Sequence, residues 1–423
     1  MTERPPEMPQ PLPAPIAVRG DGADVLARRA HAEPPHPYRG PFARDAARIL
    51  HTRAFRRLAG KTQVFTRSPG SPATGLGRWG DSPGSPATGL GRWGDSHSDP
   101  LSDHFRSRLT HTLEVTQIAR TLARVLGLNV ELAEALALVH DIGHPPFGHA
   151  GEQALDRALS AHGLRFDHNL HALRIVTWFE ERYPGFRGLN LTLGVREGIV
   201  KHSRDYPPAA HPELKEYFLD EFPPLEAQLI DPADEIAYLT ADLDDGLDAG
   251  ILALDQVREA LPLFRGFHQE TLRSFPQAAP RLAVYDALRR MLNALVTDLL
   301  CEMPAQVKAL GAGTLAEVRR APRRLAVFSA PMEQERAAAK SFLYAHFYNS
   351  PGMEEAHRHA ENVVTGLFAA LLAQPELMPA DHQAEIPAQG LARTVADYIA
   401  GMTDSYIEQL WARHGAGRTA LPN

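Results

Sequence analysis

Residues 140–152 read HDIGHPPFGHAGE, a stretch in which three histidines surround an elbow of glycine and proline that ends one helix and begins the next. Apolar residues recur with helical spacing over 130–140, so that His140 ends a row of inward-facing side chains. A second inward-facing row, over 103–127, contains His111. Two histidines that face the core require polar partners, and these rows therefore predict a buried polar site between helices.

Helical periodicity continues along most of the chain, whereas strand-like alternation is scarce. Further helices are expected over 41–59, 168–182, 190–202, 224–246, 253–272, 281–302, 332–347, 353–374 and 390–414. The sequence therefore predicts an all-α, mainly helical protein in which distant helices pack together as one large domain over residues 21–423.

Two segments depart from the helical pattern. Residues 1–20 are rich in proline and poor in core-forming residues, so we expect a disordered tail. The sequence SPGSPATGLGRWGD at 68–81 is repeated without change at 82–95, and copies so rich in glycine, proline and serine hold no unit that could stack. We therefore expect a flexible loop over 66–102, and both a ligand-responsive lid and a tolerated surface duplication are compatible with it.

Composition limits the function. The 423-residue chain has 44% hydrophobic residues, no apolar run of membrane-spanning length and no apparent signal peptide, so we expect a soluble, cytoplasmic protein that does not enter a membrane. A net charge of −7 argues against nucleic acid as the main partner, although binding of nucleic acid as a further activity is left open. The basic run between Arg44 and Lys61 suits a phosphate-bearing ligand or a solvated helix face equally well.

The residue types around the elbow favour a metal site. The single cysteine, Cys301, excludes a cysteine-based zinc site, so histidines and carboxylates must hold any metal. His140 and Asp141 point about 100° apart on a regular helix, and both reach one ion only where the helix ends, as it does here. A further carboxylate is available in DPADEIAYLTADLDD (231–245), where Asp234 and Asp242 share a face. Such a set suits Mn, Fe, Co, Zn or Ni, and Mg less comfortably.

Six motifs occur in a recognisable order: HTRAFRRLAGKTQVF (51–65), RLTHTLEV (108–115), HDIGHPPFGHAGE (140–152), FDHN (166–169), ADEIAY followed by an aspartate (233–242) and DYIAGMTDSY (397–406). Together they resemble the dGTPase-like branch of the HD-domain superfamily. The resemblance implies an HD-domain helical core with additional C-terminal helices. It also implies metal-dependent hydrolysis of dGTP, or of several deoxynucleoside triphosphates (dNTPs), to deoxynucleoside plus inorganic triphosphate.

The resemblance further implies the cofactor and partners. We expect one divalent metal per site, with Mn or Mg favoured over Fe, Co, Ni or Zn. A dNTP is the expected substrate, and a second dNTP is a candidate allosteric activator. The expected assembly is a homo-oligomer, either a hexamer or another even-numbered form.

Residue roles follow from the matched motifs. The positions that match the family's metal ligands are His111, His140, Asp141 and Asp234. His149 and Glu152 match an acid/base pair beside the α-phosphate, and His144 matches a catalytic position that faces the phosphates. Either His149 or the metal would prepare the water that attacks phosphorus as the bond to the 5′-oxygen breaks.

The remaining matched positions are expected to bind substrate: Gln63, Arg108, His168, Lys201, Tyr238 and Asp242. Arg108, His168 and Lys201 would contact phosphates. Gln63 and Asp242 would hold the sugar 3′-hydroxyl, and Tyr238 would pack on the deoxyribose where a 2′-hydroxyl has no room.

One departure from the family pattern concerns His171, which stands where the family often has glutamine. The resulting pair with His168 suggests either a second metal or a substituted phosphate-side residue. Base preference does not transfer, because the doubled loop interrupts the alignment after Gln63.

Two other functions fit the same sequence. An HD-type nucleotidase or phosphodiesterase would use the metal site on a different nucleotide and would release orthophosphate from a monophosphate. A catalytically silent, nucleotide-responsive binding protein would keep the fold without turnover. Release of intact triphosphate from a dNTP distinguishes the first interpretation from both.

Overall fold

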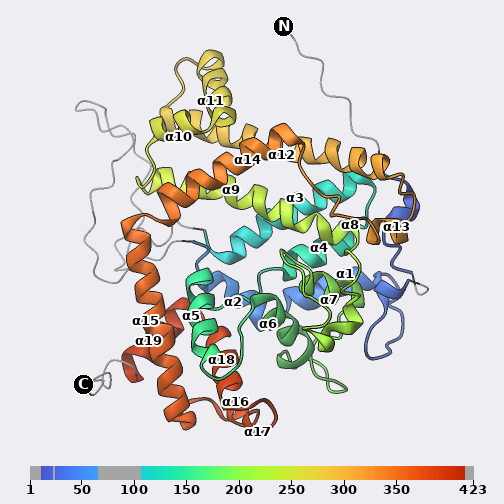
Figure 1. The fold of residues 1–423 in the computed structure, drawn as a ribbon, viewed down its shortest axis with the longest axis vertical. Helices are drawn as coiled ribbons and strands as arrows, with labels where there is room; N and C mark the ends of the chain where they lie inside the picture. Colours follow the sequence, from blue (N-terminus) through green and yellow to red (C-terminus); the bar gives the residue numbers. More distant parts are fainter. Residues whose placement is uncertain (1–10, 22–23, 65–105, 415–423) are drawn as a thin grey trace.

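The computed structural model describes residues 11–21, 24–64 and 106–414, and the described chain is mainly helical (Figure 1), which confirms the expected fold class. Within these ranges, β-type pairing is confined to two isolated bridges, Thr62 with Ser107 and Tyr183 with Phe186. No described helix is both long and apolar enough to cross a membrane.

The α-helices, in chain order, are α1 (Pro41–Leu50), α2 (Arg53–Arg57), α3 (Arg108–Leu126), α4 (Val130–Val139), α5 (Gly148–Ser160), α6 (His168–Arg174), α7 (Leu193–Val200), α8 (Leu225–Gln228), α9 (Ile230–Asp248), α10 (Leu254–Ala260), α11 (Pro262–Ser274), α12 (Pro280–Leu310), α13 (Leu315–Arg319), α14 (Ala330–Leu343), α15 (Pro351–Ala373), α16 (Ala380–Gln383), α17 (Ile386–Gln389), α18 (Leu391–Ala400) and α19 (Asp404–His414). Short 3₁₀ turns are η1 (Ala14–Ile16), η2 (Val25–Ala27), η3 (Leu58–Gly60), η5 (Pro212–Tyr217) and η7 (Pro375–Leu377), and π turns η4 (Ile175–Phe179) and η6 (Tyr344–Tyr348) extend α6 and α14.

Several expected helices are divided in the structure. The helix expected over 41–59 breaks because the Thr52 side chain accepts the Phe55 N–H and so begins α2. The helix expected over 253–272 divides where Pro262 begins α11, since proline has no N–H to continue the hydrogen-bond ladder. The C-terminal helix divides between Ala400 and Asp404, a turn that becomes important at the site.

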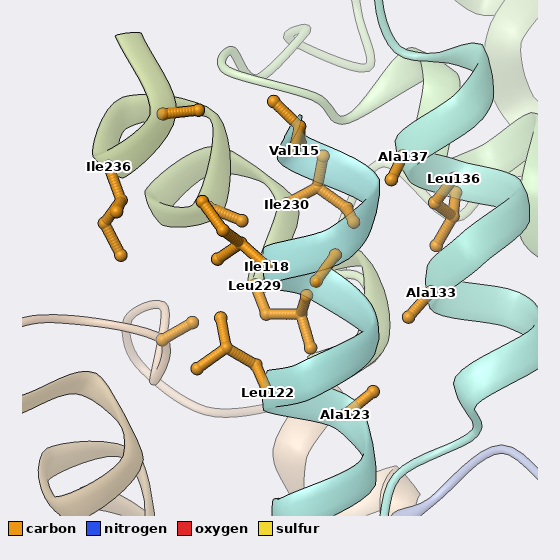
Figure 2. Packing of buried hydrophobic residues seen from close by; sticks show 14 of the residues in the cluster. Val115, Ile118, Leu122, Ala123, Ala133, Leu136, Ala137, Leu229, Ile230 and Ile236 are labelled. Carbon is orange, nitrogen blue, oxygen red and sulfur yellow. The ribbon is translucent and has the colours of Figure 1, made fainter. Parts of the chain in front are cut away.

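The main core forms around α3, which lies between α4 and α9 (Figure 2). Val115, Ile118 and Leu122 are buried along one stripe of α3, as the helical periodicity predicts. They meet apolar side chains such as Leu136 of α4 and Ile230 of α9 in one cluster. Because these three helices pack along their apolar faces, their polar inward residues are brought together at one end.

A second core holds α5 against the C-terminal helices α15, α18 and α19 (Figure 1). Its buried members include Leu155 of α5, Leu367 of α15, Ile399 of α18 and Ile407 of α19. Residues 140–147, between α4 and α5, therefore lead from the main core to the second core.

The prediction that residues 1–20 form a disordered tail is wrong for residues 11–20. Leu12, Ile16 and Val18 are buried in the main core, and the Val18 N–H donates to Glu226 Oε1 at 2.9 Å. Three apolar side chains spaced among the prolines are enough to anchor the segment. Residues 1–10 and the duplicated loop expected over 66–102 lie outside the described residues.

Candidate active site

Three helices deliver three of the expected metal ligands to one point. His111 lies in the first turn of α3, His140 directly follows α4, and Asp234 lies in the second turn of α9. One ligand atom from each lies within 4.8 Å of the other two. His111 Nε2 and Asp234 Oδ1 are 2.7 Å apart, and His140 Nε2 is 3.9 Å from the same carboxylate oxygen.

The hydrogen bonds of His140 fix its tautomer. Its Nδ1 lies 2.7 Å from the Ala137 carbonyl oxygen, which can only accept, so Nδ1 carries the proton and Nε2 carries the lone pair. This Nε2 is buried and has no hydrogen-bond partner among the described residues. Burial also lowers the pKa of His140, and a neutral imidazole with a free Nε2 is the form that binds a metal.

Asp141, the fourth expected ligand, lies beside this group. Its Oδ2 is 3.7 Å from His140 Nε2 and 3.0 Å from the Arg108 guanidinium, while its Oδ1 is 3.0 Å from His144 Nδ1. Burial alone would raise the pKa of Asp141, but Arg108, His140 and His144 together outweigh it and hold the pKa well below its usual range. Asp141 is therefore an ionised carboxylate between the cluster of three and His144.

The donor set fits a divalent cation. Within the described chain, the buried His140 Nε2 has no hydrogen-bond partner, and leaving a buried polar atom unpaired is costly. Burial raises the pKa of Asp234, yet His111 outweighs this effect and lowers it to about 2; the same pairing outweighs burial in raising the pKa of His111. Metal binding must displace the proton shared by this pair, so it should release a proton.

A second polar group surrounds the start of α5. Glu152 Oε1 accepts from His168 at both the backbone N–H (3.1 Å) and Nδ1 (2.8 Å), and Glu152 Oε2 lies 3.6 Å from His149 Nδ1. Burial raises the pKa of Glu152, but its hydrogen bonds with the two histidines outweigh burial and lower it. The His144 ring stacks on His168 with centroids 4.0 Å apart, whereas the His149 side chain is 77% exposed. The predicted partners His149 and Glu152 are thus adjacent, with His149 open to solvent.

Backbone geometry brings the two groups together. At Gly143, a Cβ would lie 1.9 Å from the His168 carbonyl oxygen, so only glycine permits this close approach. Phe147 adopts φ 62°, in the left-handed region, immediately before α5. A non-glycine residue in this conformation needs support from its surroundings.

Of the residues expected to bind the sugar, Tyr238 and Asp242 lie on α9, and Gln63 lies in the chain before α3. The Tyr238 hydroxyl donates to Glu235 at 2.7 Å, and the Asp242 carboxyl accepts from the Tyr348 hydroxyl. Burial raises the pKa of Asp242 to about 7. Gln63 Oε1 is buried without a hydrogen-bond partner in the described chain, which leaves an acceptor for a ligand hydroxyl.

Lys201 and His171, two residues that the sequence singled out, bind partners outside the cluster of three. Lys201 Nζ donates to Glu197 (2.6 Å) and to the carbonyls of Phe218 and Glu221 (2.7 Å each), so the structure does not bring its charge to the cluster. His171 Nδ1 lies 3.3 Å from Asp397, while His168 bonds Glu152. The two histidines of the expected His-x-x-His pair therefore have different partners, and the second-metal interpretation gains no support.

The sequence interpretation missed four charged or titratable groups near the cluster. The His202 ring lies 5.4 Å from that of His140, and His202 Nδ1 is 2.7 Å from Asp231. The position of Asp231, three residues before Asp234 on one helix face, was the available signal. Arg336 and Lys340 of α14 both bind Glu235, the latter at 3.1 Å, and no local sequence signal links them to α9.

A cavity of about 780 Å³ lies behind the elbow, with Lys61, Ile142 and His171 among its lining residues. Basic and acidic side chains line it in similar numbers, so the cavity shows no preference for a polyphosphate.

Comparison with known proteins agrees with this geometry. Residues 108–239 match the HD domain model, and residues 326–413 match the phosphohydrolase-associated domain model. The chain is 42% identical to a deoxyguanosinetriphosphate triphosphohydrolase-like protein of Bordetella pertussis over 382 residues, covering 89% of this chain and 90% of the relative. Relatives of the same name from Ralstonia nicotianae (40% identity, 93% and 95% coverage) and Geobacter sulfurreducens (39%, 92% and 93%) are similar.

The chain belongs to the deoxyguanosinetriphosphate triphosphohydrolase-like family. The HD domain match, residues 108–239, runs from the start of α3 into α9, so it includes the cluster of three and the elbow. HD domains bind a divalent metal, and the family places this chain among the phosphohydrolases that act on nucleotides. The phosphohydrolase-associated match covers the C-terminal helices that pack on α5.

Proposed function

We propose that the chain hydrolyses a deoxynucleoside triphosphate to deoxynucleoside and inorganic triphosphate. The observation that carries the proposal is the contact of Asp141 with His144, at 3.0 Å, which joins a metal-ligand cluster to a second group of three histidines and a glutamate. The names of the relatives support a deoxynucleoside triphosphate, and dGTP in particular, as the substrate.

The proposed metal ligands are His111, His140, Asp141 and Asp234. A divalent ion held there would supply Lewis-acid stabilisation of charge on the α-phosphate and would lower the pKa of a coordinated water. Two neutral imidazoles and two carboxylates balance a charge of two, which suits such an ion. Mn and Mg are the metals to test first.

The side chains around the elbow would bind the phosphates. The buried Arg108 guanidinium carries a permanent positive charge beside Asp141, and the stacked rings of His144 and His168 line the approach to α5. Burial and the charge of Arg108 lower the pKa of His144 well below its usual value. His144 is therefore neutral at pH 7 and would contact a phosphate as a hydrogen-bonding group.

His149 is the group best placed to move a proton. Its ring is open to solvent, and its Nδ1 faces the ionised Glu152, which orients the ring and favours a proton on that nitrogen. The opposite nitrogen, Nε2, would then accept a proton from the attacking water or, once protonated, donate to the departing 5′-oxygen.

Two residues of α9, together with Gln63, would recognise the sugar. Asp242 and Gln63 would hold the 3′-hydroxyl, and the Tyr238 ring would pack on the deoxyribose and exclude a 2′-hydroxyl. In support, Asp242 and Gln63 both present buried oxygen acceptors, and Tyr238 lies one helical turn from each of Asp234 and Asp242.

Product analysis tests the proposal. Protein loaded with Mn²⁺ is incubated with each dNTP alone and in mixtures, and the products are separated by ion-exchange chromatography. Intact triphosphate with free deoxynucleoside is the expected result, and activity confined to mixtures would identify a dNTP activator. Orthophosphate or pyrophosphate as the product, or no turnover under any condition, would contradict the proposal.

A metal-ligand variant provides the matched comparison. Asp234→Ala should lose both bound Mn²⁺ and turnover, whereas Asp255→Ala, which removes an exposed carboxylate from α10, should lose neither. An Asp234→Ala protein that turns over substrate without metal would contradict the ligand assignment.

A further inference from the structure

We propose that Asp404 is a positioning residue that holds the start of α5, and with it His149 and Glu152, in register with the metal ligands. Its kinetic consequence rests on the function proposed above, but the hydrogen bonds and their effect on the backbone do not. No role was assigned to Asp404 from sequence.

Asp404 joins three separate parts of the chain. It is the first residue of α19, and its Oδ1 accepts the Phe147 N–H at 3.0 Å while its Oδ2 accepts the Thr62 N–H at 2.8 Å. Both oxygens of one carboxylate are thus used on backbone amides that lie 257 and 342 residues away in sequence. Charge-assisted hydrogen bonds of this kind are stronger than neutral ones.

Lys61 makes a second link beside the first. Its Nζ donates to the His144 carbonyl at 2.5 Å and to the Ala400 carbonyl, at the end of α18, at 2.9 Å. The Lys61 carbonyl also accepts the Arg108 N–H at 2.9 Å. We call Asp404 and Lys61 the C-terminal clamp, because together they fasten both ends of residues 144–147 to the turn between α18 and α19.

The clamp acts where the chain passes between two cores. The metal ligands come from helices of the main core, whereas α5, with His149 and Glu152, packs on the C-terminal helices. Apolar packing alone permits small sliding movements between such bodies, and a displacement of about 1 Å at a reacting group can cost about 100-fold in rate. Hydrogen bonds to the backbone at residues 144 and 147 restrict that displacement directly.

Phe147 is the residue whose backbone should respond most to the loss of Asp404. It is held at φ 62° and immediately precedes α5, so rotation there would swing the first turn of the helix. The Phe147 N–H has Asp404 as its acceptor. Loss of the carboxylate therefore releases both the amide and the strained backbone that sets the direction of His149.

Hydrogen–deuterium exchange of the metal-loaded full chain tests the backbone part. Asp404→Ala should raise exchange in peptides that contain Phe147 and Thr62 by at least about tenfold in rate. Asp404→Asn keeps one acceptor oxygen and should give an intermediate increase. Gln409→Ala is the control, since Gln409 lies on the same helix with an exposed side chain.

Kinetics test the positioning part. Asp404→Ala should lower kcat by roughly 10- to 100-fold with KM within about twofold and bound Mn²⁺ unchanged, and Asp404→Asn should recover part of kcat. The Gln409→Ala control should match the original protein. If Asp404→Ala does not fold, Asp404→Asn carries both tests.

Unchanged exchange at Phe147 in a folded variant, or raised exchange with unchanged kcat, would overturn the inference. Loss of bound metal in parallel with kcat would also contradict it, since it would indicate general disruption. Failure of the proposed function itself looks different, because the unaltered protein would then release no triphosphate while the exchange result would stand.

Discussion

Arg108 NH1 lies 3.0 Å from Asp141 Oδ2, and only 2% of the Arg108 side chain is exposed. A buried guanidinium is costly unless it is paired, so this contact stabilises both groups while holding a permanent positive charge next to the cluster of three. The same side chain approaches α5, because a Cβ on Gly148 would lie 2.6 Å from Arg108 NH2. Arg108 therefore connects Asp141, a proposed metal ligand, with the helix that carries His149.

The position of Arg108 predicts that its replacement has opposite effects on metal affinity and on kcat/KM for the substrate. Arg108→Gln removes a cation that repels the metal and attracts phosphates, so Mn²⁺ affinity should stay equal or increase while kcat/KM for a dNTP falls by about 100-fold. Calorimetric Mn²⁺ titration and steady-state kinetics measure the two effects. Arg120→Gln is the control, because Arg120 lies on the same helix in a more exposed pair with Glu134. Parallel loss of metal and activity would contradict the assigned role.

Metal removal should lower stability. His140 Nε2 has no hydrogen-bond partner in the described structure, so a cation bound there favours the folded state. At a free metal concentration about 100 times Kd, the gain is about 2.7 kcal/mol. Thermal unfolding with Mn²⁺ and with a chelator should show a higher Tm for the loaded protein, and Asp234→Ala should show no difference. An equal shift in both proteins would place the metal elsewhere.

Glu152→Gln should separate catalysis from metal binding. The amide cannot accept from His149 and His168 as the carboxylate does, so the orientation of the His149 ring is lost while the cluster of three is unchanged. We expect kcat to fall by roughly 100- to 10,000-fold with unchanged Mn²⁺ stoichiometry. Glu361→Gln is a suitable control, since Glu361 pairs with Arg157 at the outer side of α5. Turnover close to that of the original protein would remove Glu152 from the acid/base pair.

Local patterns predicted the main helices and the inward direction of His111 and His140, because helical spacing alone determines which residues share a face with Ile118 and Leu136. The end of α4 at His140 was also predictable, since glycine and proline follow it. The break at Thr52 had a readable signal in its capping side chain, although the expected helix ran through it.

The arrangement around α5 could not be predicted from local sequence. Its packing on α15 and the bond between Phe147 and Asp404 join residues more than 200 positions apart, and spacing within either segment contains no information about such contacts. The same holds for Arg336 on Glu235. The prediction that Lys201 contacts phosphate also depended on distant contacts. In the structure, the Lys201 ammonium instead donates to the Glu197 carboxylate and to the Glu221 carbonyl.

The buried carboxyl of Asp242 should make stability depend on pH. Burial raises its pKa to about 7 from an ordinary value of 3.8, so between these values the folded chain binds more protons than the unfolded chain. The free energy of unfolding contributed by this group therefore falls as pH rises from about 4 to 7, by at most about 1.4 kcal/mol per pH unit. Above pH 7 the difference is constant.

Asp242→Asn removes this titration and keeps an acceptor for the Tyr348 hydroxyl. Denaturant unfolding of both proteins between pH 4 and pH 8 should show the variant gaining stability relative to the original chain as pH increases, with the gain levelling off near pH 7. Asp255→Asn, at an exposed site, should show no such trend. A difference between Asp242→Asn and the original chain that does not vary with pH would show that Asp242 is ionised throughout, so the carboxylate must then be stabilised by the groups around it, Tyr348 first among them.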